Sequence, residues 1–144
     1  MSSQFIQMNV EFNAPVETVF ATLSDHEAMG KVLNAKVKRI KDGQDDVNGI
    51  GSVRRITPVP LADFEETVTA FEPNKLVEYT IPKGSPLKNH LGRMVVSENG
   101  GKTHLHYTIQ FEPKVPVPLS GLVVKSVLEK VILRGLHKLA KQYH

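Results

Sequence analysis

Two adjacent pairs of charged residues are the first feature of this chain whose types and spacing suggest chemistry. Arg54 and Arg55 lie in the stretch SVRRIT, and Glu65 and Glu66 lie in the stretch FEETVT that follows it. Side chains alternate between the two faces of a strand, so one arginine and one glutamate should face inward. A buried charge is costly without a partner. We therefore expect one Arg–Glu pair inside the domain, where it either satisfies itself or also binds a polar group of a ligand.

His90 is the candidate catalytic residue. In its predicted strand it shares a face with Met94 and Val96, which indicates the inward side. A histidine in a cavity can bind a ligand or act as a general acid or base near neutral pH. It can equally be a core residue that is hydrogen-bonded to Tyr79 or Tyr107. Both interpretations stay open at this point.

A metal site is not expected. His104 and His106 are two residues apart in a predicted strand and share one face, a geometry that can bind zinc or copper. Alternation with the apolar Leu105 and Tyr107 turns both histidines outward, and nothing forces a third ligand nearby. The chain has no cysteine, which excludes disulfides and cysteine-based zinc sites. No phosphate-binding loop or Ser–His–Asp motif is present, so we expect no cofactor.

Composition indicates one globular domain, residues 1–144. The chain of 144 residues is 40% hydrophobic and 23% charged. Its net charge is +3, but the lysines are scattered and no nucleic-acid-binding motif appears, so no nucleic acid is expected as a partner. The sequence lacks a secretory signal and an apolar run of transmembrane length, which favours a cytoplasmic protein without stable membrane insertion. We expect a monomer or a weak homodimer.

Hydrophobic periodicity predicts the elements that must position these residues. A strand is expected over 5–12, a short helix begins near Pro15, and Ser24-Asp25 ends it and caps a second short helix over 26–33. Six strands are predicted near 35–41, 51–57, 63–71, 75–82, 90–98 and 102–112. Their short separators favour an antiparallel meander.

The segment 119–143 is predicted to be one long amphipathic helix. Its apolar stripe comprises Val124, Val127, Leu128, Val131, Ile132, Leu136, Leu139 and Tyr143. Lys130, Arg134, His137 and Lys141 lie on the other face. We expect the stripe to cover a curved sheet, and the basic face to be solvated rather than to contact a membrane or a partner.

Several phrases in order along the whole chain resemble the START-like superfamily, also called SRPBCC. APVETVFATLSD resembles that family's N-terminal helix, NGIGSVRRI its arginine-bearing strand, FEETVTAFEPNKLVEYTI its next strand pair, and KTHLHYTIQFEP a later strand. The resemblance is closest to small bacterial polyketide cyclase/dehydrase-like proteins, and more distant to the birch-pollen-allergen proteins and the abscisic-acid receptors. It implies an α+β helix-grip fold. In that fold a seven-stranded curved antiparallel sheet wraps around a long C-terminal helix, with two short helices after the first strand.

The distant similarity to the hormone receptors also implies two loops that close over a ligand, at 58–62 and 84–88. The residues expected to form these lids are Pro58, Pro60, Leu61, Pro86 and Leu87. His90 falls where those receptors have a cavity tyrosine. The receptors' own signature loop residues are not reproduced here, so the resemblance does not imply hormone binding.

The expected function is binding or transport of a small, mainly hydrophobic molecule with one or two polar groups, in a cavity between the sheet and the long helix. The candidate ligand-binding residues are Arg54, Glu65, Glu66, Tyr79, His90, Met94 and Tyr107. One alternative is a polyketide cyclase/dehydratase-like enzyme, with His90 as base and Arg54 stabilising an enolate oxygen. A second alternative is a partner-binding module that presents the two closed loops to another protein.

Overall fold

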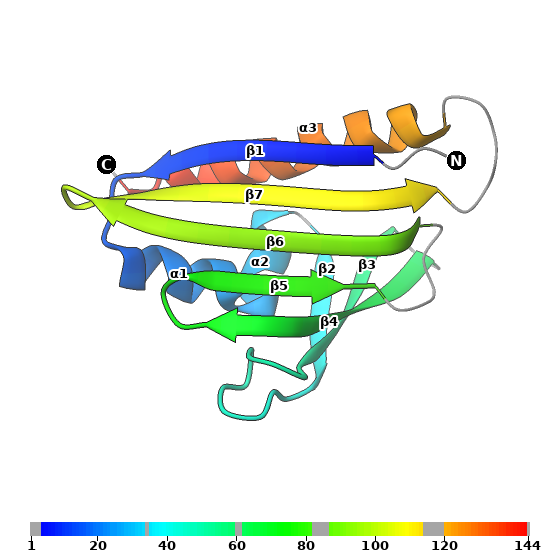
Figure 1. Cartoon of the computed structure of the whole chain (residues 1–144), viewed down its shortest axis with the longest axis horizontal. Coiled ribbons are helices and arrows are strands. Elements are labelled where there is room, and N and C mark those ends of the chain that lie inside the picture. The colour runs from blue at the N-terminus through cyan, green and yellow to red at the C-terminus, as the bar shows by residue number, and fades with distance from the viewer. Residues whose placement is uncertain (1–3, 34, 60–61, 82–86, 114–119, 144) are drawn as a thin grey trace.

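The computed structural model describes residues 4–33, 35–59, 62–81, 87–113 and 120–143 (Figure 1). In chain order its elements are β1 (Gln4–Phe12), α1 (Val16–Ser24), α2 (His26–Val32), β2 (Lys36–Lys41), β3 (Val53–Val59), β4 (Ala62–Glu72), β5 (Leu76–Thr80), β6 (Leu87–Asn99), β7 (Lys102–Pro113) and α3 (Ser120–Ala140).

The strands form one seven-stranded antiparallel sheet in the order β1-β7-β6-β5-β4-β3-β2. Strands β2 to β7 are a meander, and the two short helices carry the chain from β1 at one edge to β2 at the other (Figure 1). Asp25 caps α2, as expected, because its side chain accepts hydrogen bonds from two backbone N–H groups of that helix. The predicted α+β helix-grip fold is therefore confirmed.

The two expected lid loops are shorter than predicted. Pro58 lies within β3 and Leu87 lies within β6, so neither belongs to a loop. Pro58 can lie within the strand because the register of β3 and β4 shifts between Ile56 and Val59, and proline, which cannot donate to the ladder, is tolerated at such irregularities. The other three expected lid residues, Pro60, Leu61 and Pro86, are outside the described part of the chain.

β6 begins three residues before the predicted position and contains a bulge near its start. The register of β6 and β7 shifts between Lys88 and Leu91, and Asn89 has a positive φ of 52°. Asparagine tolerates this left-handed conformation better than most residues. Such bulges redirect the side chains beside them. His90, the residue after Asn89, therefore lies within the bulge, where the direction of the side chains along the strand changes.

The inner face of the sheet carries the core. Alternate residues of β1 and β7 are buried, namely Ile6, Met8, Val10 and Phe12 on β1 and Leu105, Tyr107, Ile109 and Phe111 on β7. Val19, Phe20 and Leu23 of α1 and Ile132, Leu136 and Leu139 of α3 pack onto them. The predicted inward set of the last strand is thus confirmed.

The predicted apolar stripe of the C-terminal helix is wrong at two positions. α3 buries Ile132, Leu136 and Leu139, but Val127 is 56% exposed and Val131 is 47% exposed. The inward row of α3 comprises Leu128, Ile132, Leu136 and Leu139. Val127 and Val131 come one position before Leu128 and Ile132, so each points about 100° away from this row around the helix axis. The side chain of Val124 lies outside the described part of the chain.

α3 packs against β1 and β7, and against α2 near its C-terminal end (Figure 1). Gly135 permits the contact with α2, because a Cβ atom at this position would collide with the carbonyl oxygen of Val32. The glycine thus lets α3 and α2 approach each other closely. In the described part of the chain, no helix is both long enough and apolar enough to cross a bilayer.

Candidate functional site: an interior polar cluster

A buried ion pair occupies the inner face of β3 and β4. Arg54 and Glu66 lie directly opposite each other on these strands and are only 7% and 6% exposed. Arg54 Nε donates a hydrogen bond of 2.6 Å to Glu66 Oε1, and Arg54 Nη2 contacts the same oxygen. Arg55 and Glu65 form the matching pair on the outer face, with a longer separation of 3.4 Å between Nη2 and Oε2. The expected interior pair is confirmed and assigned, and Glu65 lies away from the site.

Both groups of this pair stay charged because the charge of each one offsets the cost of burying the other. Burial acts to lower the pKa of Arg54, but Glu66, followed by the two neighbouring tyrosines, outweighs it, so that pKa is raised. Burial raises the pKa of the Glu66 carboxyl, against the charge and hydrogen bond of Arg54. The guanidinium therefore keeps its proton, and the interior carries one cation and one anion with no net charge.

His26 of α2 joins the pair from the other side. Its Nδ1 lies 3.2 Å from Arg54 Nη1, and its Nε2 lies 2.9 Å from Ser52 Oγ. A guanidinium can only donate, so Nδ1 accepts and Nε2 carries the proton that is donated to Ser52. Burial, followed by the charges of Arg54 and Arg39, lowers the pKa of His26 from 6.5 to about 3. His26 is therefore a neutral residue that orients the guanidinium.

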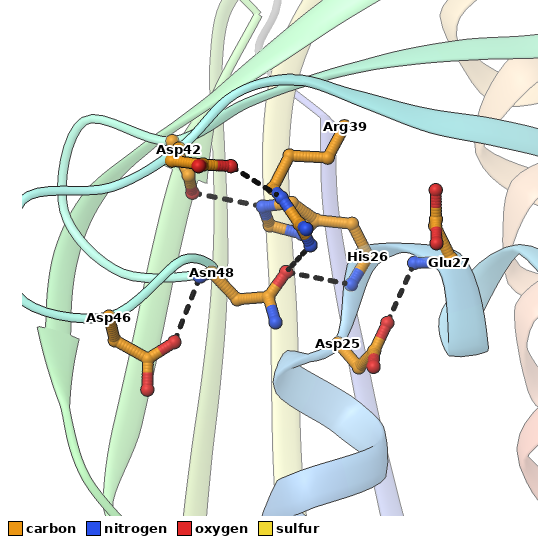
Figure 2. A network of polar contacts seen from close by, with 8 residues as sticks. Asp25, His26, Glu27, Arg39, Asp42, Asp46 and Asn48 are labelled. Carbon is orange, nitrogen blue, oxygen red and sulfur yellow. Dashed lines mark hydrogen bonds and ion pairs between the residues drawn. The ribbon is translucent and has the colours of Figure 1, made fainter.

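A network of hydrogen bonds around the loop between β2 and β3 holds His26 in place (Figure 2). Asn48 Oδ1 accepts from the backbone N–H of His26 at 3.3 Å and from Arg39 Nη1 at 3.1 Å. Asp46 in turn accepts from the backbone N–H of Asn48 at 2.9 Å. The loop thus fixes the first turn of α2, and with it the imidazole.

His26 is a member of the site that sequence reasoning missed. It was expected only as the first residue of the second short helix. It shares the buried face of that helix with Met29 and Gly30, at the i+3 and i+4 positions. That spacing was the available signal that His26 points inward.

Tyr79 and Tyr107 form the next part of the cluster. Their hydroxyl groups are hydrogen-bonded to each other, and Arg54 Cζ lies 4.9 Å from the centroid of the Tyr79 ring, in the range of a cation–π contact. Gly92, opposite Tyr79 on β6, leaves room for this ring, because a Cβ atom there would overlap it. Burial raises the pKa of Tyr79, and burial followed by the charge of Glu66 raises that of Tyr107 to about 12. Both phenols stay protonated at neutral pH.

His90 completes the cluster. It is 6% exposed, and its ring centroid lies 5.5 Å from that of Tyr79. Among the residues that the structure describes, its Nδ1 is the one buried side-chain polar atom without a hydrogen-bond partner. Burial, followed by the charge of Arg54, lowers the pKa of His90 from 6.5 to about 4. Because Nδ1 has no partner, the expected hydrogen bond to Tyr79 or Tyr107 is not made by this atom.

The structure brings five of the seven candidate ligand-binding residues into one cluster: Arg54, Glu66, Tyr79, His90 and Tyr107. Met94 is a neighbour on the same face, opposite Tyr107, and is buried in the core. Glu65 is on the outer face. The cluster presents uncharged hydrogen-bonding groups around one compensated ion pair. This arrangement suits hydrogen bonding to a polar group better than proton transfer near neutral pH.

Two grooves that the described residues form lie elsewhere. One of about 480 Å³ lies between α1, α2 and the end of α3, where Thr22, Lys31 and Tyr143 are among its lining residues. The other, of about 490 Å³, is lined by residues of β6, by the turn that joins β4 to β5 with the strand ends beside it, and by Val16. Neither contains a residue of the interior polar cluster. The cavity expected between the sheet and the long helix therefore stays a prediction.

His104 and His106 point outward, as predicted. His104 Nε2 and His106 Nδ1 both bond to Oδ1 of Asn9, at 3.0 and 2.9 Å, on the outer face of β1 and β7. In the part of the chain that the structure describes, no three histidine, cysteine, aspartate or glutamate residues are grouped so as to hold a metal ion.

Comparisons with known proteins agree with this fold. The family described as polyketide cyclase/dehydrase and lipid transport matches residues 4–144. A START superfamily protein from Mycobacterium smegmatis is similar in structure, with a TM-score of 0.79 and 20% identity over 97% of this chain and 99% of that one. A protein from Thermus thermophilus has a TM-score of 0.76 and 16% identity, over 97% and 96% of the two chains.

An enzyme is also among the similar structures. Norcoclaurine synthase from Thalictrum flavum, in complex with dopamine and hydroxybenzaldehyde, has a TM-score of 0.71 and 14% identity over 99% of this chain and 89% of that one. At such identities the likeness concerns the fold alone. No curated protein matches this chain in sequence.

Proposed function

Since the chain belongs to the polyketide cyclase/dehydrase and lipid transport family, we propose that it binds a small, mainly hydrophobic molecule in a cavity between the sheet and α3. We place the polar end of that molecule at the interior polar cluster. Its apolar remainder would lie against the apolar inner face of the sheet and α3.

The observation that carries this proposal is the Nδ1 atom of His90. A buried polar atom without a partner costs about 1–3 kcal/mol, and in the described part of the chain no group bonds to this one. A hydroxyl group of a ligand would satisfy it whichever tautomer His90 adopts, because a hydroxyl both donates and accepts. The ligand would thus supply the hydrogen bond that the protein leaves unmade.

Charge balance favours an uncharged polar group over a carboxylate. Glu66 already compensates Arg54, and His26, His90 and the tyrosines are neutral. An anionic ligand would add an uncompensated buried charge, which is strongly unfavourable. An alcohol, a phenol or a ketone adds none. Arg54 still has N–H groups that can donate to such an oxygen, because a guanidinium carries five donors.

We further propose that the chain around Pro60 and Leu61 and around Pro86 forms the entrance, by similarity to the receptor loops. Both stretches adjoin the ends of strands that carry the cluster, since β3, β4 and β6 hold Arg54, Glu66 and His90. Prolines limit the conformations of such segments, so that ordering them over a ligand costs less entropy.

The enzymatic alternative has weaker support. A general base works best when its pKa lies near the operating pH, and the pKa of His90 is lowered to about 4. The tyrosines, with raised pKa values, are poor acids at neutral pH. A partner-binding role would depend on the two entrance segments and gains no separate support from the cluster.

Displacement of a neutral fluorescent dye such as Nile red tests the proposal. 1-Decanol and decanoic acid are compared at mildly alkaline pH, where the acid is ionised. We expect the alcohol to bind about tenfold more tightly or better, because one uncompensated buried charge costs more than 1.4 kcal/mol. Tighter binding of the acid would overturn the assignment of an uncharged ligand. If neither the dye nor either compound binds, the proposed function is wrong.

A variant at His90 makes the same experiment specific to the cluster. His90→Leu should weaken decanol binding about fivefold, the worth of one hydrogen bond. His104→Leu, on the outer face, is the matched control and should change nothing. Native mass spectrometry of the protein purified from its own host, in search of a bound small molecule, would identify the natural ligand.

A further inference from the structure

The outer face of α3 combines apolar and basic side chains. We define this face by the exposed residues Val127, Lys130, Val131, Arg134 and Lys138 of α3, together with Lys141 directly after the helix. Sequence periodicity placed both valines inside, and the structure turns them to solvent. They lie one helical turn apart, next to the basic residues. The face is therefore amphipathic in a way that the sequence pattern did not indicate.

The positive charge of this face is not compensated within the described structure. From 120 to 143 the chain contains five lysine or arginine residues and a single acidic residue, Glu129. On the sheet, Arg55, Arg93 and Lys102 are each paired with a glutamate. None of the ion pairs among the described residues involves a basic residue of α3. Unpaired cations on one helix face create a field that attracts anions.

From these observations we propose that the outer face of α3 docks onto the surface of a bilayer that contains anionic lipids, with the helix axis parallel to that surface. The four basic side chains would approach the lipid phosphates and carboxylates, and Val127 and Val131 would enter the boundary between head groups and acyl chains. The inward row of α3 stays packed on the sheet, so docking needs no unfolding.

The two valines decide between a bilayer and a nucleic acid. Phosphates of a nucleic acid would also attract the basic residues, but exposed valines gain nothing from a polyanionic backbone. A bilayer with anionic lipids binds both kinds of side chain, the basic ones at its head groups and the apolar ones at the acyl boundary. The docking is peripheral and agrees with the expected lack of stable insertion. It replaces the expectation that the basic face is only solvated, and the reason for the change is the exposure of Val127 and Val131 beside it.

The rest of the surface offers a matched comparison. Lys36, Lys38 and Lys41 on β2, together with Lys75, are also exposed. The loop after β2 adds Asp42, Asp45 and Asp46, so this region has its own negative charges. Removing these four lysines changes the net charge of the protein as much as removing the four basic residues of the outer face of α3.

Co-sedimentation of the full chain with vesicles tests the proposal. Vesicles of phosphatidylcholine alone are compared with vesicles that also contain phosphatidylserine, at low salt and at physiological salt. We expect binding to the anionic vesicles that weakens as salt is added. The variant K130Q/R134Q/K138Q/K141Q should lose about tenfold or more in partition coefficient, and V127S/V131S should lose several-fold with its charge intact.

The control K36Q/K38Q/K41Q/K75Q should bind nearly as well as the parent protein. Equal losses in this control and in the α3 variant would show attraction by net charge alone and would overturn the proposal. Absence of any vesicle binding would overturn it as well. A third result would also overturn it: the protein binds duplex DNA or RNA and not vesicles, and V127S/V131S binds the nucleic acid as well as the parent protein does. Circular dichroism confirms that each variant is folded. The outcome of this test does not depend on the ligand-binding proposal, because only binding to vesicles and nucleic acid is measured.

Discussion

Arg54 and Glu66 form the same cross-strand ion pair inside the sheet that Arg55 and Glu65 form outside it, one residue further along the same two strands. The chemistry of the two pairs is identical and the strands are shared. What differs is the surroundings, since the inner pair is buried and the outer pair is solvated. Comparing the two pairs therefore isolates the effect of burial on the contribution of an Arg–Glu ion pair to stability.

Breaking the inner pair should cost far more stability than breaking the outer one. We expect Arg54→Met to lower the free energy of unfolding by about 3–5 kcal/mol, because it leaves the Glu66 carboxylate buried without a partner. Arg55→Met, at the solvated pair, should cost less than about 1 kcal/mol. Chemical denaturation of the two variants measures the difference. Similar losses at both positions would contradict the assignment of the pair in the interior.

The cost of Arg54→Met should also depend on pH. Burial already raises the pKa of Glu66 against the opposing charge of Arg54, and without that charge the pKa rises further. A group with a raised pKa in the folded state stabilises the fold at low pH and loses that contribution as pH rises through its folded value. The variant should therefore regain stability relative to the parent protein as pH falls from neutral towards 5. Denaturation at several pH values checks this, and a difference that stays constant with pH would count against a buried carboxylate.

The sequence predicted the fold well because its signals are local and repeated. Alternation in seven segments, short turns and one long amphipathic stretch agree with each other, and they suffice for the meander of β2 to β7 and for the long helix. The pairing of β1 with β7, at opposite ends of the chain, was not predicted from these local signals. Alternation also predicted that only one of Arg54 and Arg55 faces inward. It could not say which, because the two adjacent residues are of the same type and the pattern fixes only their relative orientation.

The parts that the sequence did not predict depend on contacts between distant segments. Val127 and Val131 looked inward because apolar residues usually are, yet both face solvent, because the row of α3 that meets the sheet lies about 100° away from them around the helix axis. His26 looked like an ordinary first residue of a helix, and its partners Ser52 and Arg54 come from a strand more than twenty residues away. Periodicity within one segment carries no information about such partners.

Gly92 should not tolerate a side chain. A methyl group at this position would overlap the ring of Tyr79, so Gly92→Ala should cost about 1–3 kcal/mol of stability through overpacking. The cost should fall to below about half in a Tyr79→Leu background, where the ring is absent. A thermodynamic cycle of the two single variants and the double variant measures this coupling. Purely additive effects would show that the ring and the glycine do not share this space.

The two buried histidines should make the protein lose stability in mild acid. The pKa of His26 is lowered from 6.5 to about 3, and that of His90 from 6.5 to about 4, chiefly by burial. Between pH 6.5 and 4 the unfolded chain therefore takes up protons on these residues that the native protein does not bind, and the free energy of unfolding falls as pH falls.

His26→Leu should flatten this pH dependence of the free energy of unfolding. The variant also lowers stability at neutral pH by about 1–3 kcal/mol, because Arg54 and Ser52 each lose a buried hydrogen-bond partner. His137→Leu, at an exposed position of α3, is the control for the effect of a histidine-to-leucine change as such. If the slope of the His26 variant equals that of the parent protein, His26 is not held neutral against Arg54, and the tautomer assigned to it is wrong.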